Sequence, residues 1–316
     1  MKLSYKTVVI VNPRSANGAT GRRWPAIEKT LESEFQETLD VVFTESPLHA
    51  TELTRVHLEK GYEMVVALGG DGLINEVVNG FFESDQNLFP HAVMGIISLG
   101  TASDFVRTMG WGRGLPGGAR RLGGIRTHTI DVGKASFQNF EDEREARYFL
   151  NVADFGSGGA VVERVNRTTK AFGGTISFLW GILSTLPRYK NKEIRFTIDG
   201  GLEKRRIMNN LIIANGQFYG GGIRSAPDAA VDDGLFQFVT IGDLTFPEVV
   251  WNLPRFRSGA YLTHPKVDSY VGRRLSAGCD EPVLVELDGE LVGTLPAEFE
   301  ILPRTLHVKV PDLTEP

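Results

Sequence analysis

The stretch LGGDGLINEVVNG, at residues 68–80, decides the fold expected for the first half of the chain. Three glycines and an aspartate fill residues 69–72, directly after the apolar run at 64–68. The change from an apolar run to helical spacing predicts a buried strand, a tight loop and a helix. Glycines let a bulky anion approach the main chain, and the N–H groups of a loop and of a helix N-terminus favour negative charge. The stretch therefore predicts an anion-binding loop at the carboxyl end of a strand.

Asp71 adds a chemical constraint to this loop. A carboxylate beside a phosphate repels it unless the carboxylate manages a cation or accepts a proton. Asp71 therefore indicates phosphoryl transfer rather than passive phosphate binding. The alternative is an aspartate that only caps the following helix.

The first 130 residues repeat this alternation of strand and helix. Strand-like runs and helical spacing follow one another at residues 6–12, 24–35, 39–45, 49–61, 63–70, 71–83 and 91–100. The alternation predicts an open parallel α/β sheet with covering helices. Strands that are apolar throughout, as at residues 8–11, fit burial on both faces of such a sheet.

The pattern changes after about Ile130. Strand-like runs with turn residues between them dominate the rest of the chain, and only the segments near 159–187 and 246–262 have helical spacing. The acidic stretch at 140–147 is typical of a solvated hairpin tip. The sequence thus predicts an α/β domain at 1–130 followed by a mostly antiparallel β domain.

Composition agrees with two globular domains and excludes some classes of function. The chain has 316 residues, 41% hydrophobic and 23% charged, which is enough for two cores. Its formal charge of -5 argues against a general polyanion binder, so we expect no nucleic-acid partner. Cys279 is the only cysteine, which excludes an intramolecular disulfide and suits a cytoplasmic, reducing compartment. The N-terminal run is typical of a first strand and not of a signal peptide.

One long uncharged stretch lies at residues 171–187. It is shorter than the roughly 20 apolar residues that span a bilayer, and Gly, Ser and Thr dilute it. We expect either a buried helix, or a wall for an apolar ligand or a contact with the membrane surface.

Two further loops follow strands of the predicted parallel sheet. NPRSANG at residues 12–18 follows the first strand, SLGTASD at residues 98–104 follows the fourth, and Thr44 ends the second. Because the carboxyl ends of parallel strands share one edge, these loops should converge with residues 69–72 on one crevice. Their joint occurrence indicates a nucleotide site. The phosphate loop GxxxxGK(S/T) and a well-placed GxGxxG are both absent from the sequence, so we expect neither a P-loop enzyme nor an ordinary dinucleotide dehydrogenase.

Motifs in both halves of the chain together resemble one known family. The first half has NPxS at residues 12–15, GGDG followed by INEVVNG, and SLGTxxDFxR at residues 98–107. The second half has IANGQFYGGGIRSAPDAAVDDGLFQF at residues 213–238 and LDGE at residues 287–290. These motifs resemble the diacylglycerol kinase catalytic domain family, which includes bacterial soluble lipid kinases and the sphingosine and ceramide kinases.

The family fold implies an α/β nucleotide-binding domain and a β-rich lipid-acceptor domain, with the active site in the cleft between them. In the family the final strands return to the first domain. The resemblance therefore implies that about residues 303–316 join residues 1–130, which leaves 131–302 as the acceptor domain.

The resemblance also implies cofactors and a role for each matching residue. ATP and Mg²⁺ would be the cofactors, and Asp71 would lie near the phosphates and the magnesium ion. The residues implied to line the ATP site are Asn12, Pro13, Arg14, Ser15, Ala16, Thr44, Gly69, Gly70, Asp71, Gly72, Leu73, Ile74, Asn75, Glu76, Gly100 and Thr101. Asp233, with the main-chain carbonyls of Ala230 and Leu235, would hold a structural magnesium ion, which suits a hard cation that keeps several waters.

Two acids of the LDGE motif, Asp288 and Glu290, would flank the acceptor hydroxyl. Moving the acceptor proton requires a carboxylate within hydrogen-bonding reach, and we assign Glu290 as the general base with Asp71 as the second choice. The i, i+2 spacing puts Asp288 and Glu290 on one face if the stretch is extended. A hairpin turn at Asp288-Gly289 is the alternative, and Asp233-Gly234 carries the same alternative.

Three positions depart from the motifs that are usual in the family. Ala16 replaces a glycine, Leu73 replaces a threonine, and Ala102-Ser103 replaces a Gly-Asn pair. Leu73 removes a hydroxyl near the phosphates, but the backbone donors survive all three changes. We therefore expect that nucleotide binding persists with altered affinity.

The acceptor implied by the resemblance is a lipid alcohol, reached by transient contact with the membrane surface. Residues 172–186 would line a pocket for acyl chains, and short basic runs would contact anionic head groups unless they are only solvated surface. Those runs are Arg22-Arg23, Arg120-Arg121, Lys204-Arg205-Arg206 and Arg273-Arg274. The protein would be cytoplasmic or peripheral at the membrane, and the sequence leaves a homodimer open.

Two other functions stay open from the sequence. A NAD kinase-like enzyme shares the GGDG loop and the cleft, but it would need a nucleoside pocket in the β domain. A non-catalytic nucleotide or lipid sensor is suggested by Leu73 and Ala102.

Overall fold

The computed structural model describes residues 3–36, 38–167 and 174–312 of the chain. Contacts within the chain divide it into two compact units. Unit 1 comprises Met1–Ile130 and Arg304–Pro316, and unit 2 comprises Asp131–Pro303. The chain passes from one unit to the other along two strands, β7 (Thr127–Gln138) and β18 (Glu290–Lys309).

Unit 1 is built on a parallel sheet with the strand order β2-β1-β3-β6. Its strands are β1 (Thr7–Val11), β2 (Asp40–Phe43), β3 (Met64–Gly69) and β6 (Val93–Ser98). All residues of β1, β3 and β6 are buried, because helices cover both faces, and nearly all of their side chains are apolar. The end of β18 adds a parallel neighbour to β6 through His307 and Val308.

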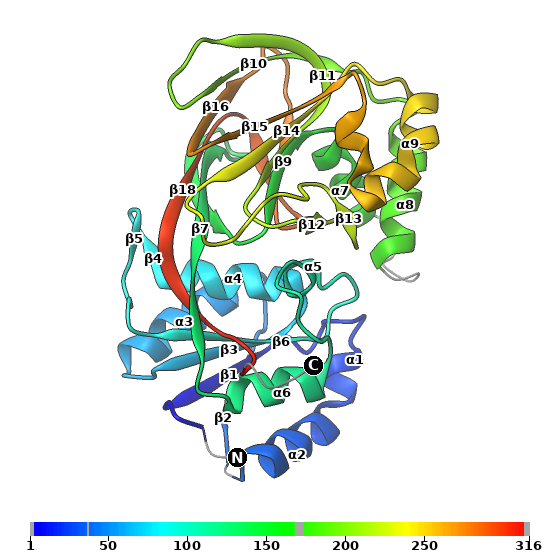
Figure 1. Ribbon diagram of the computed structural model, residues 1–316. Helices are drawn as coiled ribbons and strands as arrows, with labels where there is room; N and C mark the ends of the chain where they lie inside the picture. Colours follow the sequence, from blue (N-terminus) through cyan, green and yellow to red (C-terminus); the bar gives the residue numbers. More distant parts are fainter. Residues whose placement is uncertain (1–2, 37, 168–173, 313–316) are drawn as a thin grey trace. The chain divides into compact units, whose positions relative to one another are not determined.

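Helices lie on both faces of this sheet (Figure 1). On one face, α2 (Trp24–Phe35) and α6 (Leu115–Gly123) pack Leu31 and Leu122 into one core with β-strand valines. On the other face, α3 (His49–Glu59) and α4 (Asp71–Phe81) pack against each other and against β3. The unit also contains α1 (Ala19–Arg22), β4 (Phe82–Glu83), β5 (Gln86–Asn87) and α5 (Asp104–Thr108).

Unit 2 is an antiparallel β domain in which six strands close into a ring. The pairings run β18-β16-β10-β11-β9-β17 and return from β17 to β18, so the sheet forms a barrel. These strands are β9 (Val152–Gly156), β10 (Lys192–Ile198), β11 (Lys204–Ala214), β16 (Arg274–Gly278), β17 (Leu284–Leu287) and β18. Further strands extend or flank the ring: β7, β8 (Arg144–Phe149), β12 (Phe218–Tyr219), β13 (Ile223–Arg224), β14 (Phe236–Gly242) and β15 (Val267–Gly272).

Two apolar cores hold unit 2 together. Aromatic rings fill the first, with Phe149 stacked on Phe236 and Phe155 on Phe299 at centroid distances of 5.7 and 5.9 Å. The second lies where helices cover β9, β11 and β14 (Figure 1). Those helices are α7 (Ser157–Arg167), α8 (Gly174–Thr185) and α9 (Phe246–Ser258), followed by the 3₁₀ helix η2 (Ala260–Thr263).

The predicted fold class is confirmed for both units, parallel α/β in the first and antiparallel β in the second. No strong pattern in the sequence predicted α6, β15 or β16. In α6 three glycines weaken the helical pattern, and Gly118 is needed because a Cβ there would lie 2.9 Å from Ile97. β16 begins with Arg274, directly after Arg273, and these charged residues interrupt the apolar alternation.

Candidate functional site

The predicted nucleotide loops of unit 1 follow strands that meet at a topological switch point. β1 lies between β2 and β3, so the connection from β1 leaves towards one edge of the sheet and the connection from β3 towards the other. Ligands of open α/β sheets bind where adjacent strands diverge in this way, beyond their carboxyl ends. The loop at residues 12–18 and the loop at residues 69–72 flank this point, and the loop at residues 98–104 follows the next strand.

The first loop is held by its own polar side chains. Asn12 Oδ1 accepts the N–H of Arg14 at 2.9 Å, and the hydroxyl of Ser15 bonds to that of Thr20 at 2.6 Å. Ala16 has a left-handed φ of 51°, which explains why glycine suits this position better than a residue with a Cβ. Pro13 contacts the following helix, where a Cβ on Gly21 would lie 2.9 Å from its carbonyl oxygen.

The second and third loops approach each other through glycine backbones. A Cβ on Gly100 would lie 2.7 Å from the Cα of Gly70, and a Cβ on Gly69 would lie 2.7 Å from Leu73. The Gly69 carbonyl accepts the N–H groups of Leu99 and Gly100 at 2.7 and 3.1 Å. Side chains at these glycines would separate the loops, so the main chains themselves form this part of the rim.

Asp71 connects the same two loops. Its Oδ2 accepts the N–H of Ser103 at 2.8 Å, while Gly70 is the residue that precedes the first helical position of α4. The alternative that Asp71 only caps its own helix is therefore not what the structure shows. Ser103, which the sequence analysis did not assign to the site, bonds in turn to Ser98 and to the Gly100 carbonyl.

The residues predicted after Asp71 fall into two groups. Leu73, Ile74 and Asn75 are buried, so the Leu73 side chain lies in the core at a place where a hydroxyl was expected. Glu76 accepts the N–H of Ala50 at 3.1 Å, near the start of α3. Gly72 is half-buried at the first turn of α4, whose N–H groups favour an anion.

Thr44 and Thr101 complete the predicted nucleotide set. Thr44 is buried directly after β2 and donates its N–H to the Val11 carbonyl at 2.9 Å. Thr101 is exposed, and its carbonyl accepts a bond from Arg113 at 2.7 Å. Unit 1 thus brings the predicted loops to one edge of its sheet, while the Glu76 side chain bonds to the start of α3.

The LDGE motif of unit 2 is a two-residue β-hairpin between β17 and β18. Leu287 pairs with Glu290, and Asp288 and Gly289 both have positive φ, 50° and 90°. Positive φ at both central residues is the geometry that matches the twist of paired strands. The expectation that the stretch is extended, with Asp288 and Glu290 on one face, is therefore wrong, and the turn alternative is correct.

Asp288 is bound to the main chain of the neighbouring bend. Its Oδ2 accepts the N–H of Leu150 at 2.9 Å, and its Oδ1 accepts those of Asn151 and Val152, both at 3.0 Å. Three backbone donors on one carboxylate fix the turn against the start of β9. Glu290 is exposed at the first position of β18.

A second pair of acids beside this turn was not predicted. Asp154 on β9 and Glu286 on β17 face each other across the two strands and are 0% and 2% exposed. Glu286 accepts the N–H of Gly289 at 2.7 Å. Burial raises the pKa of Asp154 to about 7 and raises that of Glu286 well above its ordinary range. The alternation of acids at 286, 288 and 290 drew attention to this stretch, but such spacing does not indicate which acid is buried.

The predicted magnesium loop, residues 230–235, lies directly before β14. Asp233 is exposed and its Oδ1 accepts the N–H of Leu235 at 2.9 Å, while the buried Asp131 accepts the N–H of Gly234 at 2.6 Å. Among the residues that the structure describes, no group of three or more His, Cys, Asp and Glu side chains could hold a metal ion. A site of one carboxylate and the carbonyls of Ala230 and Leu235 is consistent with this, because Mg²⁺ needs few protein ligands and keeps several waters.

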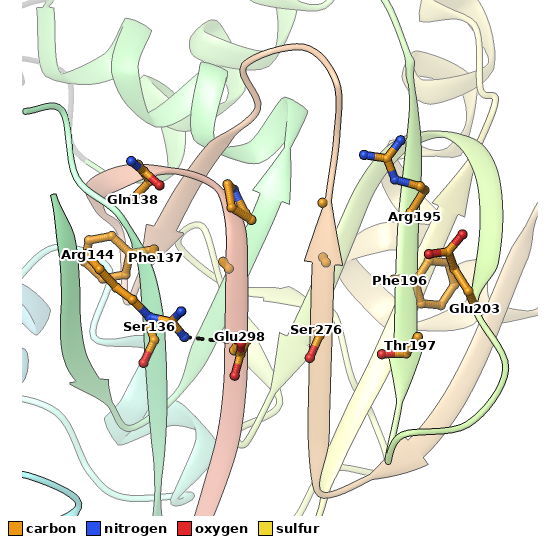
Figure 2. Close-up of a pocket in the computed structure, with 14 residues that line it drawn as sticks. Ser136, Phe137, Gln138, Arg144, Arg195, Phe196, Thr197, Glu203, Ser276 and Glu298 are labelled. Atoms are coloured by element: carbon orange, nitrogen blue, oxygen red, sulfur yellow. Dashed lines mark hydrogen bonds and ion pairs between the residues drawn. The ribbon is translucent and has the colours of Figure 1, made fainter. Parts of the chain in front are cut away.

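A cavity of about 300 Å³ in unit 2 is lined by none of the predicted site residues. Its walls come from β7, β10, β16 and β18, with Phe137 and Phe196 between polar side chains such as Arg144 and Glu298, which form an ion pair at 3.2 Å (Figure 2). The predicted acceptor residues therefore do not belong to this cavity.

The predicted membrane features are only partly exposed. Arg121 is 4% exposed and donates to the Ile96 carbonyl at 2.9 Å, so the expected head-group contact is wrong for Arg121, whereas Arg120 of the same run is exposed. Arg205, Arg206 and Arg274 pair with acids, which leaves less net charge on those runs than the sequence suggests.

The uncharged stretch at 171–187 falls largely on α8, with residues 171–173 outside the described part. Ile182 and Leu186 are buried, but Leu179, Trp180 and Leu183 are 42–43% exposed. These three residues, here called the α8 patch, share one helix face by their spacing. The buried-helix alternative therefore holds for one face only. No helix in the described ranges is long and apolar enough to cross a bilayer.

Comparison with known proteins identifies two family domains in this chain. Residues 6–135 match the diacylglycerol kinase catalytic domain, and residues 151–310 match the YegS C-terminal NAD kinase beta sandwich-like domain. The chain is 28% identical to the diacylglycerol kinase of Staphylococcus carnosus over 308 residues, which cover 96% of this chain and 94% of that protein. It is 27% identical to the diacylglycerol kinase of Bacillus subtilis, covering 96% and 95%.

Solved structures show the same fold at lower identity. A diacylglycerol kinase from Bacillus anthracis superposes with a TM-score of 0.69 at 18% identity, covering 98% of each chain. A yeast NADH kinase bound to NADH has a TM-score of 0.51 at 10% identity, covering 98% of this chain and 84% of that one. The likeness to both structures concerns the fold alone.

Proposed function

The chain belongs to the diacylglycerol kinase catalytic domain family, and from that premise we propose that it is an ATP-dependent lipid kinase. The reaction transfers the γ-phosphoryl group of ATP to a hydroxyl of a lipid such as diacylglycerol. The observation that carries the proposal is the rim of unit 1, where the loops at 69–72 and 98–104 meet through glycine backbones and Asp71, and the loop at 12–18 follows the strand next to β3.

The unit 1 rim supplies what phosphoryl transfer needs from a nucleotide site. Transfer of a γ-phosphoryl group depends on positioning and on neutralising charge, with little covalent chemistry for the protein to perform. Backbone N–H groups of the glycine loops and the start of α4 donate to the phosphates. Asp71, fixed by Ser103, would hold the Mg²⁺ that accompanies ATP.

Glu290 is the proposed general base for the acceptor hydroxyl. It stands at the exposed first position of β18, directly after a turn that Asp288 and Glu286 fix. Asp288 therefore acts as a positioning residue, because both of its oxygens already accept main-chain bonds. Asp71 stays the second choice for the base.

Asp233 with the carbonyls of Ala230 and Leu235 is proposed to hold a second, structural Mg²⁺. Asp131 stabilises this loop, because its buried carboxylate accepts the Gly234 N–H. A cation there would stabilise the connection into β14 and supply no chemistry to the transfer step.

The α8 patch is proposed as the part of unit 2 that contacts the lipid surface. Large apolar side chains that are 42–43% exposed on one helix face suit the interface of a bilayer, where tryptophan is enriched. Arg164 lies over the Trp180 ring at 5.2 Å and adds a positive charge for anionic head groups.

The proposal is tested by incubating the protein with radiolabelled ATP, Mg²⁺ and a lipid mixture in mixed micelles, and by identifying labelled products by mass. We expect a labelled lipid monophosphate, and diacylglycerol is the first acceptor to assay. NAD in place of lipid tests the NAD kinase-like alternative. Radiolabelled phosphate found in NADP and in no lipid would contradict the proposal. Binding of ATP without transfer of phosphate to any lipid or to NAD would favour a non-catalytic sensor.

A further inference from the structure

Two buried acids beside the LDGE turn lie directly opposite each other. Asp154 and Glu286 are cross-strand partners in the β9–β17 ladder and are almost completely buried. Like charges at such positions repel each other, and a buried charge without compensation is strongly unfavourable. The two carboxyl groups can therefore carry one negative charge at most while the strands stay paired, so they share a proton.

The surrounding donors decide which acid holds the charge. Asn210 Nδ2 donates to Asp154 Oδ2 at 3.1 Å, and the Gly159 N–H at the start of α7 also donates to this carboxylate. A helix N-terminus stabilises an anion further. Glu286 accepts the Gly289 N–H, which a protonated carboxyl group still does through its carbonyl oxygen, although less strongly than a carboxylate. The charge thus resides on Asp154, and the proton on Glu286 points to Asp154.

The Asp154 side chain has no room to rearrange. A Cβ on Gly158 would lie 2.0 Å from Asp154 Oδ2, so the first turn of α7 closes over the carboxylate. The titratable groups that act on the pair are Tyr189 and Tyr219 from one side, and Asp288 and Glu290 from the turn. The charges that act on Glu286 come from Asp154, Asp288 and Glu290, which are all acids and all oppose its ionisation, while the Gly289 N–H favours it.

We propose that Asp154 and Glu286 are positioning residues for Glu290, acting through the main chain of Gly289. The inference rests on the proposed function, since Glu290 is the base of that reaction. While Glu286 is protonated, it bridges Asp154 and the Gly289 N–H and holds the turn in its paired geometry. When Glu286 ionises, repulsion from Asp154 displaces its side chain, and the turn that bears Glu290 loses this restraint.

The sign of the pH dependence follows from the raised pKa of Glu286. Because burial raises that pKa, the bridging form persists well above the pH at which an ordinary glutamic acid ionises, and it is lost as pH rises through the raised pKa. The proposal therefore predicts an alkaline fall in kcat, with KM for ATP unchanged because unit 1 supplies the predicted nucleotide loops.

The decisive variant is Glu286→Gln, compared with Glu286→Ala. Glutamine keeps both bonds without titrating, since its NH₂ donates to Asp154 and its carbonyl accepts from Gly289. We expect Glu286→Gln to keep kcat at neutral pH within about threefold and to lose the alkaline fall. Alanine removes the acceptor of the Gly289 N–H, and we expect kcat to drop on the order of 10²-fold, as for a misplaced catalytic group.

Glu193→Gln is the matched control, because Glu193 is exposed on β10 of the same unit. Its pH profile should match that of the wild type. An alkaline fall in kcat with the same midpoint in Glu286→Gln and wild type overturns the proposal. A loss of kcat at neutral pH in Glu286→Gln that is as large as the loss in Glu286→Ala also overturns it. If Glu286→Ala does not fold, the pH dependence of kcat in Glu286→Gln still tests the proposal.

A second measurement does not depend on turnover. Hydrogen exchange of the Gly289 amide, followed by NMR, should show protection in the wild type that declines as pH rises, and protection in Glu286→Gln that stays constant. Absence of kinase activity in the wild type would remove the proposed function and leave this comparison intact. Equal decline in both proteins would contradict the role of the pair in holding the turn.

Discussion

At the scale of single residues, the nucleotide rim depends on glycines whose Cα atoms approach other backbones. At Gly100 the close neighbour is a backbone atom, because a Cβ there would meet the Cα of Gly70 at 2.7 Å. A contact with a backbone cannot be relieved by a change of side-chain rotamer. The loop that carries Ser103, and with it the bond to Asp71, would have to move.

Gly100→Ala should therefore weaken the binding of Mg-ATP by at least about tenfold, which is about 1.4 kcal/mol. Calorimetric titration gives the dissociation constant directly. Gly112→Ala is the control, because a Cβ on Gly112 meets no atom within 4 Å. Equal affinities for Gly100→Ala and wild type would show that the close approach of these loops does not matter for the nucleotide.

The same scale shows which site residues the sequence could identify. GGDG after an apolar run predicted the loop at residues 69–72, and Asp288-Gly289 carried the turn alternative that proved correct. The partners could not be predicted, because Ser103 binds Asp71 across 32 positions and Asp288 binds Leu150 across 138. Nor does the spacing distinguish Glu286, which is buried, from Glu290, which is exposed.

At the scale of elements, β9 and β17 carry a buried acid pair into a barrel whose core consists mainly of apolar side chains. The predicted strands were recognised by apolar runs and turn residues, but the ladder that sets Asp154 opposite Glu286 is a non-local pairing that no local pattern encodes. An acid whose pKa is raised by folding stabilises the folded protein only at low pH. For Asp154 that contribution is complete below its ordinary pKa of 3.8 and is lost as pH rises towards about 7.

Asp154→Asn should accordingly flatten the dependence of thermal stability on pH. We expect the wild-type melting temperature to fall between pH 4 and pH 7 by more than that of the variant, because the variant has no carboxyl group to ionise at this position. Differential scanning calorimetry at both pH values measures the two falls. Identical falls in both proteins would mean that Asp154 ionises as easily in the folded chain as in the unfolded one.

The exposed face of α8 makes a separate prediction. Replacing Trp180 and Leu183 together by serine should lower partition onto anionic liposomes by at least about tenfold, because apolar area at the interface is lost. Sedimentation of the protein with liposomes measures the bound fraction. Phe140→Ser is the control, since Phe140 is 56% exposed but lies beside Glu141 and Asp142 in the β7–β8 hairpin. A loss of binding in the control alone would assign the contact to another surface.

At the scale of the whole molecule, the proposed reaction uses residues from two units of different architecture. The sequence distinguished these architectures because uninterrupted apolar strands and helical spacing change to strands with turns near Ile130. Closure of the barrel could not be foreseen, since it depends on β18, which pairs with both β16 and β17. Unit 1 supplies the predicted ATP loops and unit 2 the proposed base, and β18 begins at that base and ends beside β6.

The substitution Glu290→Gln tests this division of labour most directly. Phosphoryl transfer from labelled ATP to the lipid acceptor and the dissociation constant of Mg-ATP are measured on the same preparations of variant and wild type. The account predicts that transfer falls on the order of 10²–10⁴-fold, because the hydroxyl loses its base, while the affinity for Mg-ATP stays close to normal. Transfer at the wild-type rate, or a loss of nucleotide affinity that accounts for the whole defect, would contradict it.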